Sequence, residues 1–210
     1  TQNALQKSYE NDYQAAIDIY TKSIHEVPEE LCAGLYEKRS NEKIKLEDYQ
    51  GSLEDINKAI EIADNSSNEI TKRSLYRLFL LRGRLKQDNL EEYQSAIDDF
   101  HKSINIKQED ISKGNSRKKY ISEYDEQTLF KENYLRIANI NYLNLENYSS
   151  AIANYTKCLE INESIESNPN INNKPNDYFF IYMQRGRSKV ANKEFKESIN
   201  DFNKALEIEP

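Results

Sequence analysis

One sequence pattern recurs along the chain and constrains the fold more than any other feature. Its clearest copy, from Glu92 to Ile106, reads EYQSAIDDFHKSINI. Altered copies begin at Asp12, Asp48, Asn147 and Glu194. The second residue of each copy is aromatic. A pair of one small and one aliphatic residue follows it, then a larger apolar residue, and then a second such pair. A pattern that recurs in tandem predicts a repeat architecture, in which each unit packs mainly against its neighbours.

The spacing within each copy is that of an α-helix. In the copy at Asp48 the apolar and small residues are Ser52, Leu53, Ile56, Ala59 and Ile60. They form one stripe of a helix, whereas a strand would need a period of two. A second amphipathic run precedes each copy, so we expect each repeat to be a helix–turn–helix unit. These first helices are expected at Asn3–Glu10 (cut short), Glu30–Leu46, Glu69–Gln87, Tyr124–Leu145 and Tyr178–Asn192.

Two further features concern the packing and the spacing of the repeats. Gly83 and Gly186 fall in the middle of predicted first helices, where glycine costs up to about 1 kcal/mol relative to alanine. This cost predicts a close backbone contact with the partner helix at each glycine.

The opening aromatic residues are unequally spaced, which predicts loop insertions between repeats at 107–120 and 162–177.

The pattern resembles the tetratricopeptide repeat family. The positions that carry the resemblance in the last repeat are Tyr182, Gly186, Phe195, Phe202, Ala205 and Pro210, with Ser198 in place of the usual alanine. The resemblance implies an all-α, right-handed solenoid of about five hairpins, forming a single array over 1–210. The expected repeats are 1–29 (truncated), 30–66, 69–108, 121–163 and 177–210.

Composition excludes several classes of function. The formal net charge is −7 and the isoelectric point is about 5.1, which argues against nonspecific binding to nucleic acids or anionic membranes. No apolar run approaches the ~20 residues needed to cross a bilayer, and no signal peptide opens the chain. Cys32 and Cys158 lie in different repeats, so a disulfide scaffold is not indicated. A cytoplasmic location is the resulting expectation.

No motif predicts a catalytic, cofactor or metal site, so we expect a protein that is not an enzyme. His25 and His101 fall on second helices of non-adjacent repeats. Cys158 occupies a small position of its stripe and is expected to be buried. Cys32 lies near a helix start, where a thiol can become reactive. The stretch Lys113–Lys119 lacks the strand and spacing of a phosphate-binding loop.

Acidic pairs recur at Glu29–Glu30, Glu91–Glu92 and Asp98–Asp99. We assign them to helix starts, where carboxylates favourably oppose the helix dipole, or to polar helix faces. No general acid or base is assigned among them.

In the family that the sequence resembles, first helices line a concave groove that binds peptides. Matching positions here predict a groove lined by Lys38, Asn41, Arg77, Arg84, Arg136, Asn139, Tyr142, Gln184 and Arg187. This basic and amide-rich set suits carboxylates and extended backbones. The alternative is that the arginines pair with acidic residues of neighbouring helices. Arg39, Arg82 and Arg185 precede the small residue in three repeats, and this recurrence predicts a packing or inter-repeat role instead.

One subset of the family clamps the acidic C-terminus of Hsp70 and Hsp90 chaperones with lysines and asparagines. This chain keeps Asn41 and Arg136 but has Glu37 and Glu132 where lysines are needed, and Leu81 where the second asparagine is needed. The two glutamates would repel an acidic tail. We therefore do not expect a typical Hsp70/Hsp90 carboxylate clamp.

These observations predict a protein–protein interaction scaffold that binds a peptide or helical segment of an unidentified partner in the concave groove. One alternative is a regulatory or sensor domain of a larger multidomain protein. Another is a homo-oligomerisation module that uses the terminal hairpins, because the last helix still carries Phe195, Phe202 and Leu206.

Overall fold

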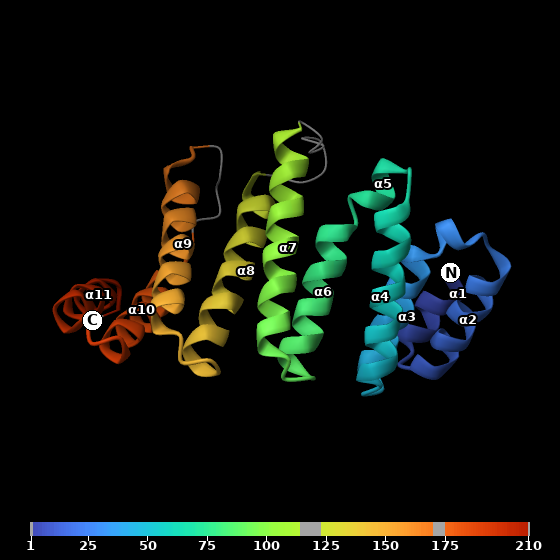
Figure 1. Cartoon of the computed structure of the whole chain (residues 1–210), viewed down its shortest axis with the longest axis horizontal. Helices are drawn as coiled ribbons and strands as arrows, with labels where there is room; N and C mark the ends of the chain where they lie inside the picture. Colours follow the sequence, from blue (N-terminus) through green and yellow to red (C-terminus); the bar gives the residue numbers. More distant parts are fainter. Residues whose placement is uncertain (1, 114–122, 170–174, 210) are drawn as a thin grey trace. The chain divides into compact units, whose positions relative to one another are not determined.

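The computed structural model describes residues 2–113, 123–169 and 175–209, and every secondary-structure element in these ranges is helical (Figure 1). Backbone contacts divide the chain into two compact units, Thr1–Ser112 and Lys113–Pro210. Each unit has its own hydrophobic core. The predicted all-α, solenoid-type fold of tandem helical hairpins is confirmed.

The first unit consists of three helical hairpins that follow one another in chain order. Its elements are α1 (Gln2–Tyr9), α2 (Tyr13–Glu26), the 3₁₀ helix η1 (Glu29–Leu31), α3 (Ala33–Lys45), α4 (Tyr49–Asn65), α5 (Glu69–Lys72), α6 (Leu75–Asp88) and α7 (Tyr93–Ser112). The hairpins are α1–α2, α3–α4 and α6–α7 (Figure 1). Helix α3 also packs against α2, and α6 against α4. Each first helix therefore contacts the second helix of the preceding hairpin.

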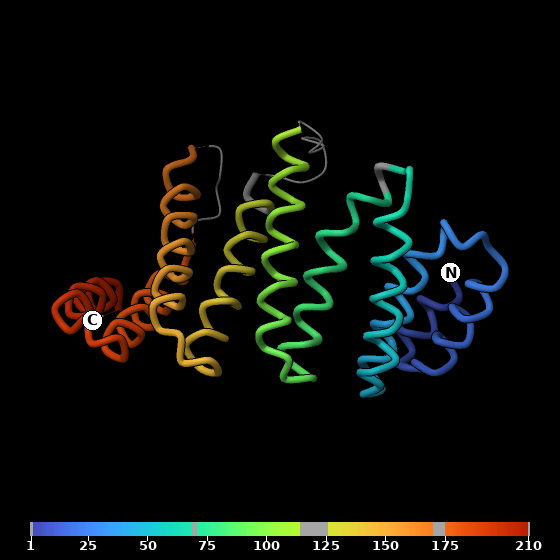
Figure 2. The backbone as a smooth tube through the Cα atoms, in the orientation of Figure 1, coloured from blue at the N-terminus to red at the C-terminus, as the bar shows by residue number. Residues whose placement is uncertain are grey.

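The second unit repeats this arrangement with two hairpins. Its helices are α8 (Glu123–Leu143), α9 (Tyr148–Ser167), α10 (Tyr178–Ala191) and α11 (Phe195–Ile208). Helices α8 and α9 run side by side and are joined by a tight turn (Figure 2). Helix α10 pairs with α11 and also packs against α9. The core of the second unit contains Tyr155, Cys158 and Ile181, which are fully buried.

Every second helix starts from the same tight turn. The residue two positions before the opening aromatic has a φ of 50 to 65°, a left-handed conformation that few residues other than glycine adopt. These residues are Asn11, Glu47, Glu91, Glu146 and Lys193. In three repeats the next residue then caps the helix. For example, Oδ1 of Asp48 accepts a hydrogen bond from the backbone N–H of Gly51 at 3.0 Å.

The two mid-helix glycines make room for phenylalanine rings. A Cβ atom on Gly83 would lie 2.7 Å from Cε1 of Phe100, and one on Gly186 would lie 2.6 Å from Cε1 of Phe202. The predicted close contact exists, but the group that approaches the glycine is an aromatic side chain of the paired helix. The helix backbone is not the partner.

Two second helices continue through segments that the sequence predicted as loops. Helix α7 includes 107–112, where Lys107 is buried, and α9 includes 162–167. In α9 the buried amide of Asn162 donates to Oδ1 of Asp177 at 2.8 Å. The predicted loop starts are therefore wrong, because polar residues there find partners inside the unit. Other parts of the predicted insertions, at 114–122 and 170–174, lie outside the described residues.

Candidate peptide-binding surface

The arginines that precede the small residue of a first helix are bound within the fold. In three hairpins this arginine donates from Nε and Nη2 to both oxygens of an aspartate on the paired second helix. The distances are 2.6 to 2.9 Å. The pairs are Arg39–Asp55, Arg82–Asp99 and Arg185–Asp201. Such bidentate, charge-assisted contacts are among the stronger hydrogen bonds in proteins.

Each of these arginines also reaches the preceding hairpin. Its Nη1 donates to a polar side chain on the preceding second helix, at 2.7 to 3.0 Å. The acceptors are Thr21 for Arg39, Asn57 for Arg82 and Thr156 for Arg185. A lysine four residues after the arginine contacts the same aspartate at 2.8 to 3.0 Å. These are Lys43, Lys86 and Lys189. We call each set an arginine clamp.

The predicted packing and inter-repeat role of Arg39, Arg82 and Arg185 is thus confirmed. The assignment of Asp99 to a polar helix face is wrong, because its side chain is buried between α6 and α7. At Asp201, burial alone would raise the pKa. Hydrogen bonds from the clamp's arginine and lysine outweigh burial and leave the pKa below its usual range.

The α8–α9 hairpin lacks the clamp. At the three corresponding positions it carries Ile137, Asn141 and Asn154. Ile137 is buried, and each asparagine donates to the carbonyl oxygen four residues earlier on its own helix, at 2.8 Å. In place of the charged trio, this hairpin therefore has a buried isoleucine and two asparagines whose amides donate within their own helices.

In the first unit the predicted groove residues have unequal surroundings. Lys38 is exposed on α3, and Arg84 is half-buried on α6. Arg77 of α6 pairs with Glu37 of α3, with 2.7 Å between Nη2 and Oε2. Asn41 donates to the carbonyl oxygen of Glu37 at 3.0 Å. The ion pair brings the first helices of two successive hairpins together.

In the second unit most of the predicted residues have structural contacts. Nε of Arg136 lies 3.3 Å from a carboxylate oxygen of Glu132, one turn earlier on α8. Asn139 accepts a hydrogen bond of 2.6 Å from the hydroxyl of buried Tyr155. The ring of Tyr142 packs beside the ring of Tyr148, with 6.0 Å between centroids. The alternative of internal pairing therefore holds for the arginines at 77 and 136.

Three predicted groove residues keep their side chains available. Lys38 and Arg187 are exposed, and Gln184 is half-buried. Within the described part of the chain, none of the three side chains forms an ion pair or a hydrogen bond that meets standard geometry. The first helices thus present cationic and amide groups that the fold does not use.

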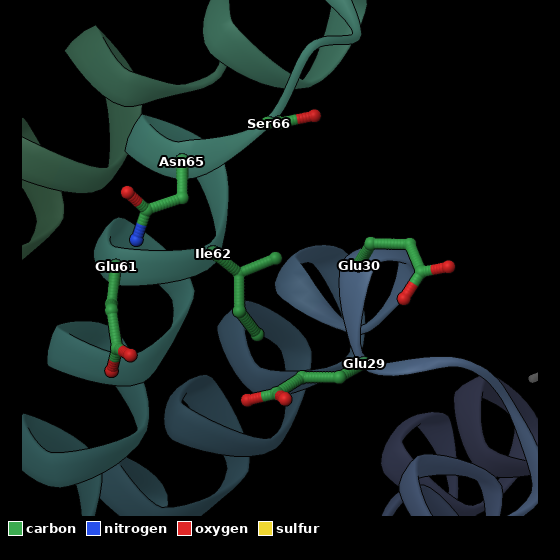
Figure 3. Close-up of a pocket in the computed structure, with 6 residues that line it drawn as sticks. All are labelled: Glu29, Glu30, Glu61, Ile62, Asn65 and Ser66. Carbon is green, nitrogen blue, oxygen red and sulfur yellow. The ribbon is translucent and has the colours of Figure 1, made fainter.

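A pocket that the sequence did not predict lies between η1 and α4. It has a volume of about 240 Å³ and is lined by Glu29, Glu30, Glu61, Ile62, Asn65 and Ser66 (Figure 3). Figure 3 shows carboxylates on both of its sides. Lys58 contacts two of them, Glu29 at 2.6 Å and Glu61 at 3.2 Å, and these hydrogen bonds raise the pKa of Lys58. The carboxylates at 29 and 30 were the only sequence signal for the pocket.

The candidate reactive residues are inert or isolated. Cys32 is buried, and burial raises the pKa of its thiol, so the suggestion of a reactive Cys32 is wrong. Cys158 is buried as predicted, and burial raises its pKa to about 12. Both thiols are free. His25 and His101 are exposed on α2 and α7. No cluster of metal-ligating side chains and no membrane-spanning helix occurs among the described residues.

Comparisons with known proteins agree with this geometry. Residues 132–165 and 181–210 match the family model described as tetratricopeptide repeat. Among solved structures, MamA superimposes with a TM-score of 0.66 and 16% identity, over 98% of this chain and 94% of MamA. YrrB, described as a TPR protein with an unusual peptide-binding site, gives 0.63 and 15% identity, over 99% of this chain and 83% of YrrB. Acl4, described as the assembly chaperone of RpL4, superimposes with a TM-score of 0.65 and 10% identity, over 99% of this chain and 73% of Acl4. A search of curated protein sequences finds no match.

Proposed function

Because residues 132–165 and 181–210 match the tetratricopeptide repeat model, we propose that this chain is a protein-binding scaffold whose first helices hold an extended or helical segment of a partner. Tandem helical repeats offer a long surface of side chains on a framework whose packing is independent of the ligand. The described peptide-binding site of YrrB and the described chaperone role of Acl4 support a protein partner.

The observation that carries the proposal is a contrast between two positions of the first helices, one with a recurring residue and one that varies. The clamp position is arginine in three hairpins, and there its guanidinium is hydrogen-bonded to an aspartate of the paired helix. The position directly after the small residue has no such fixed identity. It is Asn41, Arg84, Asn139 and Arg187 in successive repeats. One of these residues, Arg187, is exposed and the other three are half-buried, and variation at partly exposed positions on a constant framework is what partner selection requires.

The chemistry of these positions favours a partner segment with carboxylates. A guanidinium presents several N–H donors and no acceptor, and a lysine ammonium likewise only donates. Exposed cations at Lys38 and Arg187 therefore attract acidic side chains, and the nearby glutamates at 37 and 132 are already paired with arginines of the fold. Asparagine and glutamine amides, such as that of Gln184, bind the polar backbone groups of an extended segment. We accordingly expect an acidic peptide rather than a basic one.

The test begins with selection of peptides from a displayed random library against the full chain. The affinity of an enriched peptide is then measured by fluorescence anisotropy for Lys38→Glu and for Arg187→Glu. We expect one of them to weaken binding by about tenfold or more, equivalent to ~1.4 kcal/mol. Both residues are exposed, so circular dichroism should remain that of the wild type.

A matched control is Lys22→Glu, which makes the same charge change on exposed surface of a second helix, α2. It should alter the affinity by less than about twofold. Enrichment of basic peptides, or equal loss in Lys22→Glu and both first-helix variants, would contradict the proposal.

A further inference from the structure

One side of α10 carries a stripe that is apolar apart from a single arginine. We call Phe180, Met183, Arg187 and Val190 the α10 stripe. These residues are three, four and three positions apart, which is the spacing of the seam along which two α-helices pack in a coiled coil. In α3, α6 and α8 the corresponding stripes contain at most two apolar residues each. Among these four first helices, an apolar seam is therefore specific to α10.

The fold uses other sides of α10 for its own packing. Gly186 lies against the ring of Phe202 on α11, and Arg185 donates to Thr156 of α9 (Figure 1). With 3.6 residues per turn, the α10 stripe lies on the side of the helix opposite Arg185. Its phenylalanine and valine are each 41% exposed, its arginine is exposed, and its methionine is half-buried against the core of the second unit.

The exposure of the stripe does not depend on α10 belonging to the C-terminal hairpin of this sequence. Within each unit the next first helix packs on the preceding second helix, as α6 does on α4 and α10 on α9. The position of Phe180 is taken by Gly34 in α3 and by Glu132 in α8, and each of these helices is followed by a hairpin of its own unit. Gly34 is exposed, and the side chain of Glu132 is 37% exposed. A following hairpin therefore leaves this side of a first helix open.

The charges of α10 favour an acidic ligand. The helix contains Arg185, Arg187 and Lys189 and neither aspartate nor glutamate. Arg185 and Lys189 share the carboxylate of Asp201. Arg187 has no ion pair or hydrogen bond with any residue in the ranges 2–113, 123–169 and 175–209. Its guanidinium, which lies between apolar residues, is thus available to an external carboxylate.

We propose that the α10 stripe docks an α-helix of a partner protein that carries its own apolar seam, with a glutamate or aspartate opposite Arg187. Apolar side chains of this helix pack on Phe180, Met183 and Val190. A charged residue at one position of an apolar seam fixes the register and the choice of partner. The inference rests on the proposed function, because α10 is one of its first helices, and it narrows the partner segment to an acidic, amphipathic helix.

A second copy of the chain fits this stripe poorly. In a symmetric dimer each contact occurs twice, so two paired α10 stripes would bury two copies of Arg187 with no carboxylate on either stripe. Burial of an unpaired charge is costly. Each chain also carries a net charge of −7, which disfavours association of two copies. The occupant is accordingly a helix of a different protein.

The probe is a displayed library of single helices, three heptads long, selected against the full chain. Its seam positions are randomised, and its other positions are alanine and glutamine, which favour helix without adding charge. We expect enriched peptides to carry apolar residues at all seam positions except one, and aspartate or glutamate at that one.

The affinity of an enriched peptide is then measured by fluorescence anisotropy. Phe180→Asp and Val190→Asp should each weaken binding by about tenfold or more. Val27→Asp is the matched control, because Val27 follows α2 and has a similar exposure of 37%. It should alter the affinity by less than about twofold. Wild-type circular dichroism of the variants confirms that they fold.

An exchange of charges tests the contact with Arg187. Arg187→Glu in the chain should weaken the peptide by about tenfold. Replacement of the peptide's acidic seam residue by lysine should weaken binding to the wild-type chain. The same replacement should recover most of the lost affinity for the Arg187→Glu chain, because the two charges again have opposite signs.

Three results would overturn the proposal. The first is a selection that enriches no peptide, or only peptides without an acidic seam residue. The second is a peptide that Arg187→Glu weakens and Phe180→Asp does not, which would leave the proposed function standing. The third is a wild-type dimer in sedimentation equilibrium that Phe180→Asp dissociates, since a second copy would then be the occupant. Peptides from an unbiased library that no first-helix substitution weakens would instead contradict the proposed function, and this inference with it.

Discussion

The arginine clamp between α10 and α11 should be costly to break one residue at a time. Asp201 is 2% exposed, and its oxygens lie 2.6 and 2.9 Å from Arg185 and 2.8 Å from Lys189. Asp201→Asn leaves two cations facing a neutral amide, and removal of one partner of a buried ion pair typically costs about 3–5 kcal/mol. Because both cationic side chains keep 15% exposure, we expect the lower end of that range, about 3 kcal/mol.

The α8–α9 hairpin supplies the template for removing the clamp as a whole. The variant that copies it combines Arg185→Ile, Lys189→Asn and Asp201→Asn. Its model residues, Ile137, Asn141 and Asn154, are packed or donate their amides to their own helix. Replacement of a complete buried ion network by neutral residues is often close to neutral in free energy. The triple variant should therefore recover most of the stability that the single variant loses.

Amide hydrogen exchange with mass spectrometry is the suitable assay, because a terminal hairpin can open locally while the rest of the chain stays folded. A loss of about 3 kcal/mol corresponds to exchange on the order of 100-fold faster in α10 and α11. Amides of α3 and α4 in the other unit serve as the internal control. Two results would contradict this account of the clamp: α10 and α11 amides of Asp201→Asn that exchange within about threefold of the wild-type rate, or a triple variant that exchanges as fast as the single one.

Three further predictions concern single sites. Acid should loosen the α10–α11 hairpin, because the pKa of Asp201 lies below its ordinary 3.8 in the folded state. This stability is present above that ordinary value and is lost as the pH falls through the folded-state pKa, and Asp201→Asn should flatten the dependence of the urea midpoint on pH. In urea titrations Tyr155→Phe should cost about 1 kcal/mol by removing the bond to Asn139. Tyr20→Phe should cost nothing or stabilise, because that buried hydroxyl has no partner within the described residues. Glu47→Gly should stabilise by about 1 kcal/mol at a φ of 60°, and Glu47→Ala, which keeps the Cβ atom, should not.

The sequence predicted the second helices well because the residues that define their pattern are the ones that pack. Ala96 and Phe100 of the clearest copy are fully buried. The turn before each second helix left no such signal, since the left-handed residue there, such as Glu91, is never glycine. The extension of α9 was missed for a related reason. Asn162 is polar and looks like a loop residue until the fold brings Asp177 within 2.8 Å of it.

The candidate site was predictable only in part. An arginine recurs before the small residue in three repeats, and this recurrence alone assigned Arg82 to packing rather than to the groove. The structure confirms the packing role. Its partner Asp99 was missed, although an aspartate and an arginine occur together in three repeats and are both absent from a fourth. Pairing across a hairpin depends on which faces meet, and a single helical stripe does not contain that information. The same limit applies to Arg77, whose partner Glu37 lies on another first helix.

The clamps also bear on the kind of partner that the first helices attract. Each clamp sets an arginine and a lysine of one first helix against a single aspartate, as Arg39 and Lys43 do with Asp55. Each therefore leaves one formal positive charge in excess on a chain whose total is −7. These charges are largely shielded from solvent, where screening by salt is weakest. They add to the field of exposed cations such as Lys38 and Arg187. Under the proposed function, an acidic segment would therefore be drawn to the first helices of a chain whose net charge would repel it elsewhere, and this contrast in charge would contribute more to selectivity than any single contact.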